Sequence, residues 1–165
     1  MDVRFLARYY WNRVFWFFAK PVRRVYRFVR RPRGRAAKVL ITNGNKVLLV
    51  RPGYNHRQWT TPGGAVDKNE TFEVAARREV EEELDIQLDA LSEITTYDHV
   101  FDGQTNIVQI FHAEVTDPRF TVDGIEIVEA EWFPIERLPP DRRSRIDEIV
   151  KIFKASAKTG TPLAL

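Results

Sequence analysis

Residues 64–86 read GAVDKNETFEVAARREVEEELDI, and their acidic residues carry a helical spacing. At about 3.6 residues per turn, Glu79, Glu82 and Glu83 occupy positions i, i+3 and i+4 and therefore share one face of a helix. The adjacent face is apolar and consists of Ala76, Val80 and Leu84. The pattern predicts an amphipathic helix that packs on one side and carries three clustered carboxylates on the other.

The clustered carboxylates suggest a cation site. Like charges at this spacing destabilise a helix by about a few tenths of a kcal/mol per pair, so a bound cation would explain why they lie together. Carboxylate oxygens with no cysteine or histidine among them suit Mg²⁺ or Mn²⁺ and are a poor match for zinc. The alternative is a glutamate-rich helical face that is simply exposed to solvent.

The full spacing favours the cation site, because it resembles the Nudix box. That pattern is Gly, five residues, Glu, seven residues, Arg-Glu, an aliphatic residue, any residue, Glu-Glu, any residue, Gly and an aliphatic residue. Eight of its nine specified positions agree, namely Gly64, Glu70, Arg78, Glu79, Val80, Glu82, Glu83 and Ile86. The preceding residues 59–64, WTTPGG, resemble the loop that leads into the Nudix helix. Its glycines permit close approach of the backbone to a metal or phosphate.

Asp85 is the one departure from the box, which has glycine at this position. The family's glycine follows the helix, where a cap residue in the left-handed conformation is common. Aspartate is among the few other residues that adopt this conformation. We therefore expect Asp85 to be a tolerated but mildly destabilising cap, with its charge poorly placed at the negative end of the helix.

Composition and charge divide the chain into two parts. At 165 residues it is long enough for one α/β catalytic domain and an appendage. Residues 1–38 hold twelve Lys or Arg and one acid, a net charge of +11, whereas the rest holds fourteen against twenty-two, a net charge of −8. The chain contains no cysteine, which excludes disulfides, thiolate metal sites and a cysteine nucleophile.

The basic N-terminal arm, residues 1–35, is also aromatic, because ten of the chain's twenty aromatic residues lie in residues 1–28. Charges interrupt the arm too often for a transmembrane helix, and its apolar run is too short for a secretory signal. Its composition favours a cytoplasmic protein with peripheral contact to an anionic membrane surface. The alternatives are an organellar presequence, a nucleic-acid-binding arm, and a helix packed on the domain or on a partner chain.

Beyond the arm, the apolar pattern predicts mainly strands. Asn43-Gly44-Asn45 joins two apolar runs and is a strong hairpin signal. Strands are expected at residues 36–42, 46–50, 92–100, 105–115 and 126–133, and a second helix at 145–157. In this order the elements resemble the Nudix fold, an α/β fold with a mixed β-sheet between helices, here with an N-terminal basic aromatic helix. The expected parts are an arm at 1–35, a Nudix hydrolase domain at 36–157 and a frayed tail at 158–165.

The resemblance implies a hydrolase that cleaves the pyrophosphate bond of a nucleoside diphosphate linked to another group, by attack of water at phosphorus. The metal ligands that it implies are Gly63, through its carbonyl, and Glu79, Glu82 and Glu83. The supporting residues that it implies are Gly64, Glu70 and Arg78. The implied cofactor is Mg²⁺ or Mn²⁺, and the implied partner is a small nucleotide substrate.

The identity of the general base and of the phosphate-binding residues stays open at this stage. The base is a box glutamate, Glu82 or Glu83, or a later carboxylate, for which Glu126 and Glu129 are candidates. The candidates for contact with substrate phosphates are Arg51, His56 and Arg57. Two other functions are also open: a non-catalytic Nudix-fold module that binds a nucleotide or partner, and RNA 5′-end processing with the arm holding the strand.

Overall fold

The structure is a computed structural model of the chain, and it describes residues 34–55, 57–101, 104–124 and 126–159. Its elements are β1 (Arg35–Asn43), β2 (Lys46–Pro52), the 3₁₀ helix η1 (Gly53–Asn55), α2 (Phe72–Leu84), β3 (Ser92–Phe101), β4 (Gln104–Glu114), β5 (Ile127–Pro134) and α3 (Arg145–Thr159). The expected strands and the helix at 145–157 lie within two residues of these bounds, and α3 continues two residues past its expected end. The expected arm helix and the end of the tail fall outside the described residues. In the described part of the chain, no helix has the length and apolar character needed to cross a membrane.

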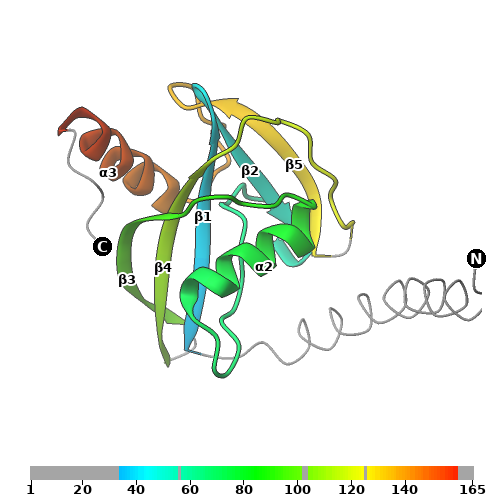
Figure 1. The fold of residues 1–165 in the computed structure, drawn as a ribbon, viewed down its shortest axis with the longest axis vertical. Helices are drawn as coiled ribbons and strands as arrows, with labels where there is room; N and C mark the ends of the chain where they lie inside the picture. The colour runs from blue at the N-terminus through cyan, green and yellow to red at the C-terminus, as the bar shows by residue number, and fades with distance from the viewer. Residues whose placement is uncertain (1–33, 56, 102–103, 125, 160–165) are drawn as a thin grey trace, which may run out of the picture. The chain divides into compact units, whose positions relative to one another are not determined.

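The strands form a mixed sheet, as expected. Its order is β3-β4-β1-β2-β5, with β1 parallel to β4 and antiparallel to β2 (Figure 1). The β1–β2 hairpin pairs Asn43 with Lys46, and Gly44 has φ 58°, the left-handed conformation that the turn sequence predicted. The parallel pairing of β1 with β4 brings a strand from the second half of the chain beside the first strand.

Both faces of the sheet are covered by helices. Because side chains alternate along a strand, successive residues of β1 enter different cores. Val39 and Ile41 pack with Val80 of α2 on one face, while Leu40 packs with Ile146 of α3 on the other. All five are at most 1% exposed, and burial of each such side chain stabilises the fold by about 1.5–3 kcal/mol. Figure 1 shows α2 lying across one face of the sheet.

The segment that leads into the box lies between β1 and β2, where the two strands separate. The N–H of Ala37 on β1 donates to the carbonyl of Gly64 (2.9 Å), and Val50 on β2 exchanges two backbone bonds of 2.9 Å with Thr60. Gly63 has φ +112°, and a Cβ at this position would overlap the carbonyl oxygen of Ala37. Only glycine fits at position 63, and its backbone therefore lies directly against β1.

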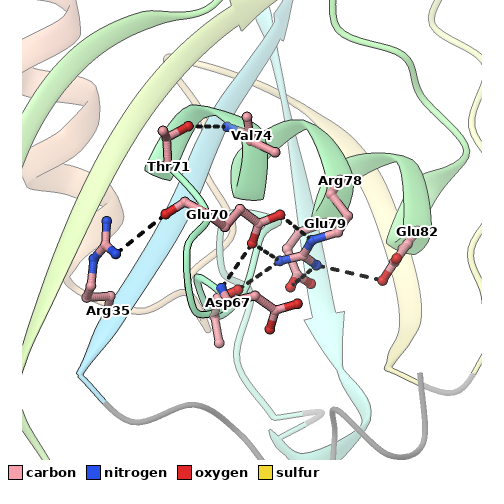
Figure 2. Close-up of polar contacts among 9 residues, drawn as sticks. Arg35, Asp67, Glu70, Thr71, Val74, Arg78, Glu79 and Glu82 are labelled. Carbon is pink, nitrogen blue, oxygen red and sulfur yellow. Dashed lines mark hydrogen bonds and ion pairs between the residues drawn. The ribbon is translucent and has the colours of Figure 1, made fainter. Parts of the chain in front are cut away.

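Helix α2 is capped at both ends. The hydroxyl of Thr71 accepts a hydrogen bond from the N–H of Val74 (3.2 Å; Figure 2). At the other end Asp85 has φ 58° and ψ 32°, and its N–H donates to the carbonyl of Glu81 (3.0 Å). The expectation of a left-handed aspartate cap is confirmed, and its effect on stability stays a prediction.

Candidate active site

Three carboxylates converge between α2 and the segment before β5. Glu79, Glu83 and Glu126 each offer one oxygen, and these oxygens lie within 4.8 Å of one another. Glu79 and Glu83 are i and i+4 on α2 and are 8% and 5% exposed, whereas Glu126 is partly buried. The fold thus adds to the helix a third acidic side chain from a distant part of the sequence.

The segment that carries Glu126 is fixed to the C-terminus of α2. The N–H of Thr121 donates to the carbonyl of Leu84, the last helical residue (2.8 Å). The carboxylate of Asp123 accepts hydrogen bonds from the N–H groups of Glu126 (2.9 Å) and Ile127 (2.8 Å). The bond from Thr121 satisfies a carbonyl that the end of the helix leaves unpaired. The two bonds to Asp123 fix the backbone at Glu126 and so orient its side chain.

The glycine loop contacts two of the three carboxylates. The N–H of Gly63 donates to Oε2 of Glu83 (2.8 Å). A Cβ on Gly64 would lie 2.6 Å from Oε2 of Glu79, so the absence of a side chain lets the helix approach the loop. The loop also contacts β1 through Lys38, whose Nζ donates hydrogen bonds to the carbonyls of Gly63 and of Thr61, the latter at 3.3 Å.

Arg78 joins the loop to the helix (Figure 2). Its Nε and Nη2 each donate to the carboxylate of Glu70 at 2.8 Å, and its Nη1 donates to Glu79 at 2.5 Å. A further bond of 3.0 Å runs from Nη2 to the carbonyl of Ala65. Burial lowers the pKa of Arg78, but the two carboxylates more than offset this and raise it. The fork of the guanidinium therefore orients Glu79 and holds the loop with one side chain.

The electrostatics of the site favour an added positive charge. Burial raises the pKa of Glu83 to about 8, and the charges of Glu79 and Glu126 act in the same direction. Burial also raises the pKa of Glu79, although Arg78 opposes this shift. The donor set consists of oxygen atoms alone, which is the set that Mg²⁺ and Mn²⁺ prefer. The residues present therefore fit a hard divalent cation.

These shifts predict a pH-dependent stability for the metal-free protein. A carboxyl whose pKa is raised on folding stabilises the fold at low pH, and this stabilisation is lost as pH rises from its unfolded value of 4.5 to about 8. Between pH 5.5 and 8.5, Glu83→Gln should therefore gain about 3 kcal/mol over the parent protein in free energy of unfolding. Urea titrations of both proteins in EDTA test this. A stability difference that does not change with pH would contradict it.

The other candidate residues lie outside the three-carboxylate group. Glu82 is partly exposed, and its carboxylate lies 3.8 Å from Nη1 of Arg78. Arg51 stacks on the ring of Trp59 at 4.4 Å and forms ion pairs with Asp141 (2.5 Å) and Glu129 (3.3 Å). Arg57 is exposed, and His56 falls outside the described residues. Among the described residues, the structure thus separates Glu126 from the site's other late candidate, Glu129.

Two residues of the site were missed in the sequence. Lys38 is a single charged residue within the apolar run that predicted β1, and that interruption was a usable signal. Asp123 precedes Gly124, a pair typical of turns, but nothing in the sequence links it to the helix end. Its function depends on how the segment before β5 meets α2.

The comparisons with known proteins agree with this fold. The NUDIX domain family model matches residues 32–153, and the chain therefore belongs to the Nudix family, as the box predicted. It is 33% identical over 120 residues to an NAD-capped RNA hydrolase, NudC, of Pseudomonas aeruginosa, covering 71% of this chain and 42% of that protein. It is 32% identical over 103 residues to an oxidized purine nucleoside triphosphate hydrolase of Danio rerio, covering 61% of this chain and 66% of that protein.

A solved structure supports the same fold. The binary complex of an Ap4A hydrolase from C. elegans superposes with a TM-score of 0.66 at 24% identity, over 76% of this chain and 98% of that one. At this identity the likeness concerns the fold. The chain spans less than half the length of the NudC relatives that it matches.

Proposed function

We propose that this chain is a pyrophosphohydrolase that cleaves a nucleoside diphosphate linked to a further group. The observation that carries the proposal is the convergence of Glu79, Glu83 and Glu126 within 4.8 Å, beside a glycine loop, in a Nudix family member. Relatives named for hydrolysis of NAD-capped RNA, and a structural neighbour named for hydrolysis of Ap4A, support a substrate with nucleotide-linked phosphates. Complete box carboxylates argue against a module that only binds.

The three carboxylates and the carbonyl of Gly63 would hold Mg²⁺ or Mn²⁺ in this proposal. When bound, the ion supplies charge neutralisation at the phosphate oxygens. Arg78 and Glu70 keep the helix and the glycine loop at a fixed separation, which preserves the ligand geometry. Asp123 holds the backbone at Glu126, so that this carboxylate stays directed at the other two.

The proton acceptor for the attacking water is proposed to be Glu126 or a box glutamate, with Glu82 and Glu83 as the alternatives. The position of Glu126 favours it as the proton acceptor, because it reaches the site from the segment before β5 and is only partly buried. Glu82 is also partly exposed, at the edge of the helix beside Arg78. Phosphate contact by Arg51, His56 and Arg57 stays a prediction.

A hydrolysis screen tests the proposed function. The purified chain should release products from at least one class among dinucleoside polyphosphates, dinucleotides such as NAD, nucleotide sugars and nucleoside triphosphates. Each substrate is offered with Mg²⁺, with Mn²⁺ and with excess EDTA, and products are identified by chromatography. We expect turnover with a metal and none in EDTA. Turnover that persists in EDTA, or binding without turnover across all classes, would contradict the proposal.

A second candidate is the removal of a nucleotide cap from the 5′ end of RNA. It is favoured by the NudC relatives, which are named as NAD-capped RNA hydrolases, and by the charge of +11 over residues 1–38, which suits the phosphates of an RNA strand. Such a reaction uses the same carboxylates on a pyrophosphate bond within a longer substrate. Capped and uncapped oligoribonucleotides of one sequence, added to the same screen, distinguish it from action on small nucleotides.

The arm, residues 1–35, is proposed to make peripheral contact with an anionic membrane. Attraction of its basic residues is worth about 1 kcal/mol per charge near the surface, and burial of aromatic rings adds a part that salt does not screen. We expect the full-length protein to float with vesicles that contain phosphatidylserine, to bind less at high salt, and to ignore neutral vesicles. If the full-length protein binds single-stranded RNA but does not float with the vesicles, this would instead favour an arm that binds nucleic acid.

A further inference from the structure

Lys38 places a positive charge where the proposed metal site has its backbone ligand. It lies on β1 between the buried residues Ala37 and Val39, and its side chain is partly buried. Its Nζ donates hydrogen bonds to the carbonyls of Gly63 and Thr61. The carbonyl of Gly63 is the same oxygen that the proposed site would offer to a divalent cation.

The ammonium group also acts on the two buried carboxylates of α2. The positive charge of Lys38 opposes the rise in pKa that burial imposes on Glu83, and it does the same for Glu79. Glu83 is tied to this corner by its bond from the N–H of Gly63 (2.8 Å). One glycine therefore joins the ammonium, through its carbonyl, to the carboxylate, through its N–H.

The other basic group near the site has a different position. Arg78 divides its hydrogen-bond donors among Glu70, Glu79 and the carbonyl of Ala65. It lies at the edge of the carboxylate group that faces the loop at 65–70. Within the described residues, Lys38 is the basic side chain that contacts the carbonyl of Gly63.

We propose that Lys38 is an internal counter-ion of the metal-free site, and that it gives up the carbonyl of Gly63 when a divalent cation binds. The inference rests on the proposed metal site. Two cations cannot share one carbonyl oxygen and adjacent carboxylates without strong mutual repulsion, because the site is buried and poorly screened. Lys38 thereby stabilises the empty site and weakens metal binding.

The test compares metal affinity with stability in the absence of metal. Lys38→Met removes the charge and keeps the length of the side chain, while Lys38→Gln removes the charge and keeps a donor for the carbonyl of Gly63. Lys151→Met, at an exposed position of α3, is the matched control for the change in net charge. The measurements are the melting temperature in EDTA and the affinity for Mn²⁺, read from the electron paramagnetic resonance of the free ion.

Both Lys38 variants should melt below the parent protein in EDTA and bind Mn²⁺ about tenfold more tightly or better, because a competing charge has gone. The control should match the parent in both. If Lys38→Met does not fold, the affinity of Lys38→Gln decides. Unchanged or weaker Mn²⁺ binding by the folded variants would overturn the inference, since a residue that only supports the site lowers affinity when it is lost. If neither the parent nor the variants bind Mn²⁺, the proposed metal site fails and the inference fails with it.

Discussion

Replacing Glu83 by glutamine is expected to lower turnover of the substrate found in the screen by about a thousandfold. Glu83 is 5% exposed, lies within 4.8 Å of the other two carboxylates and accepts the N–H of Gly63. Glutamine keeps an oxygen for that hydrogen bond, but it removes the charge that a divalent cation requires. The loss should therefore be in chemistry and metal binding rather than in folding.

The stability of the Glu83→Gln variant separates a role of Glu83 in metal binding and chemistry from a role in folding. Because burial opposes a charge at this position, Glu83→Gln should melt at or above the temperature of the parent protein in EDTA at pH 8. Glu81→Gln, on the exposed side of the same helix, makes the same change in charge and should leave turnover within about twofold of the parent. Near-full activity of Glu83→Gln, or a loss of activity matched by a loss of stability, would contradict the assigned role.

Replacing Arg78 by methionine is expected to destabilise the domain by about 3–5 kcal/mol. The change leaves Glu70 and Glu79, which are 11% and 10% exposed at the side chain, without the guanidinium that pairs them. It also removes the bond to the carbonyl of Ala65, which ties the loop to α2. Arg78→Lys should recover only part of this stability, because an ammonium cannot reproduce the bidentate contact with Glu70.

Urea denaturation in EDTA measures this effect without interference from metal. Arg77→Met is the matched control, since Arg77 is the next residue of the helix, is 34% exposed and pairs with the exposed Glu73. We expect the control to cost on the order of 1 kcal/mol, because it loses an exposed ion pair and one bond to the carbonyl of Leu88. Equal losses for the two variants would mean that the Arg78 network has no special importance.

Most of the fold followed from local signals in the sequence. Asn43-Gly44-Asn45 specified the hairpin through its turn conformation, and the apolar stripe at 76, 80 and 84 specified which side of α2 is buried. Asp85 could be read as a left-handed cap because few other residues tolerate that conformation. These features depend on residues a few positions apart, which is the range over which helical and strand periodicity operates.

The site was harder to predict from the sequence, because it depends on contacts between segments that are distant in the chain. Helical spacing grouped Glu82 with Glu79 and Glu83, whereas the group of oxygens within 4.8 Å of one another consists of Glu79, Glu83 and the distant Glu126. The carboxylate of Glu82 lies 3.8 Å from Nη1 of Arg78. The choice between Glu126 and Glu129 required the docking of the segment before β5 on the end of α2. The ion pair of Arg51 with Asp141, ninety positions away in the chain, also could not be read from local spacing.

The central claim is that Glu126 completes a cation site with Glu79 and Glu83, and the affinity of Glu126→Gln for Mn²⁺ tests it most directly. Glu129→Gln is the control, because Glu129 is a nearby carboxylate that pairs with Arg51 at the surface instead. We expect Glu126→Gln to bind Mn²⁺ at least about tenfold more weakly than the parent protein, and Glu129→Gln to bind it equally well. Equal affinity for Mn²⁺ in the parent protein and Glu126→Gln would contradict the three-carboxylate site.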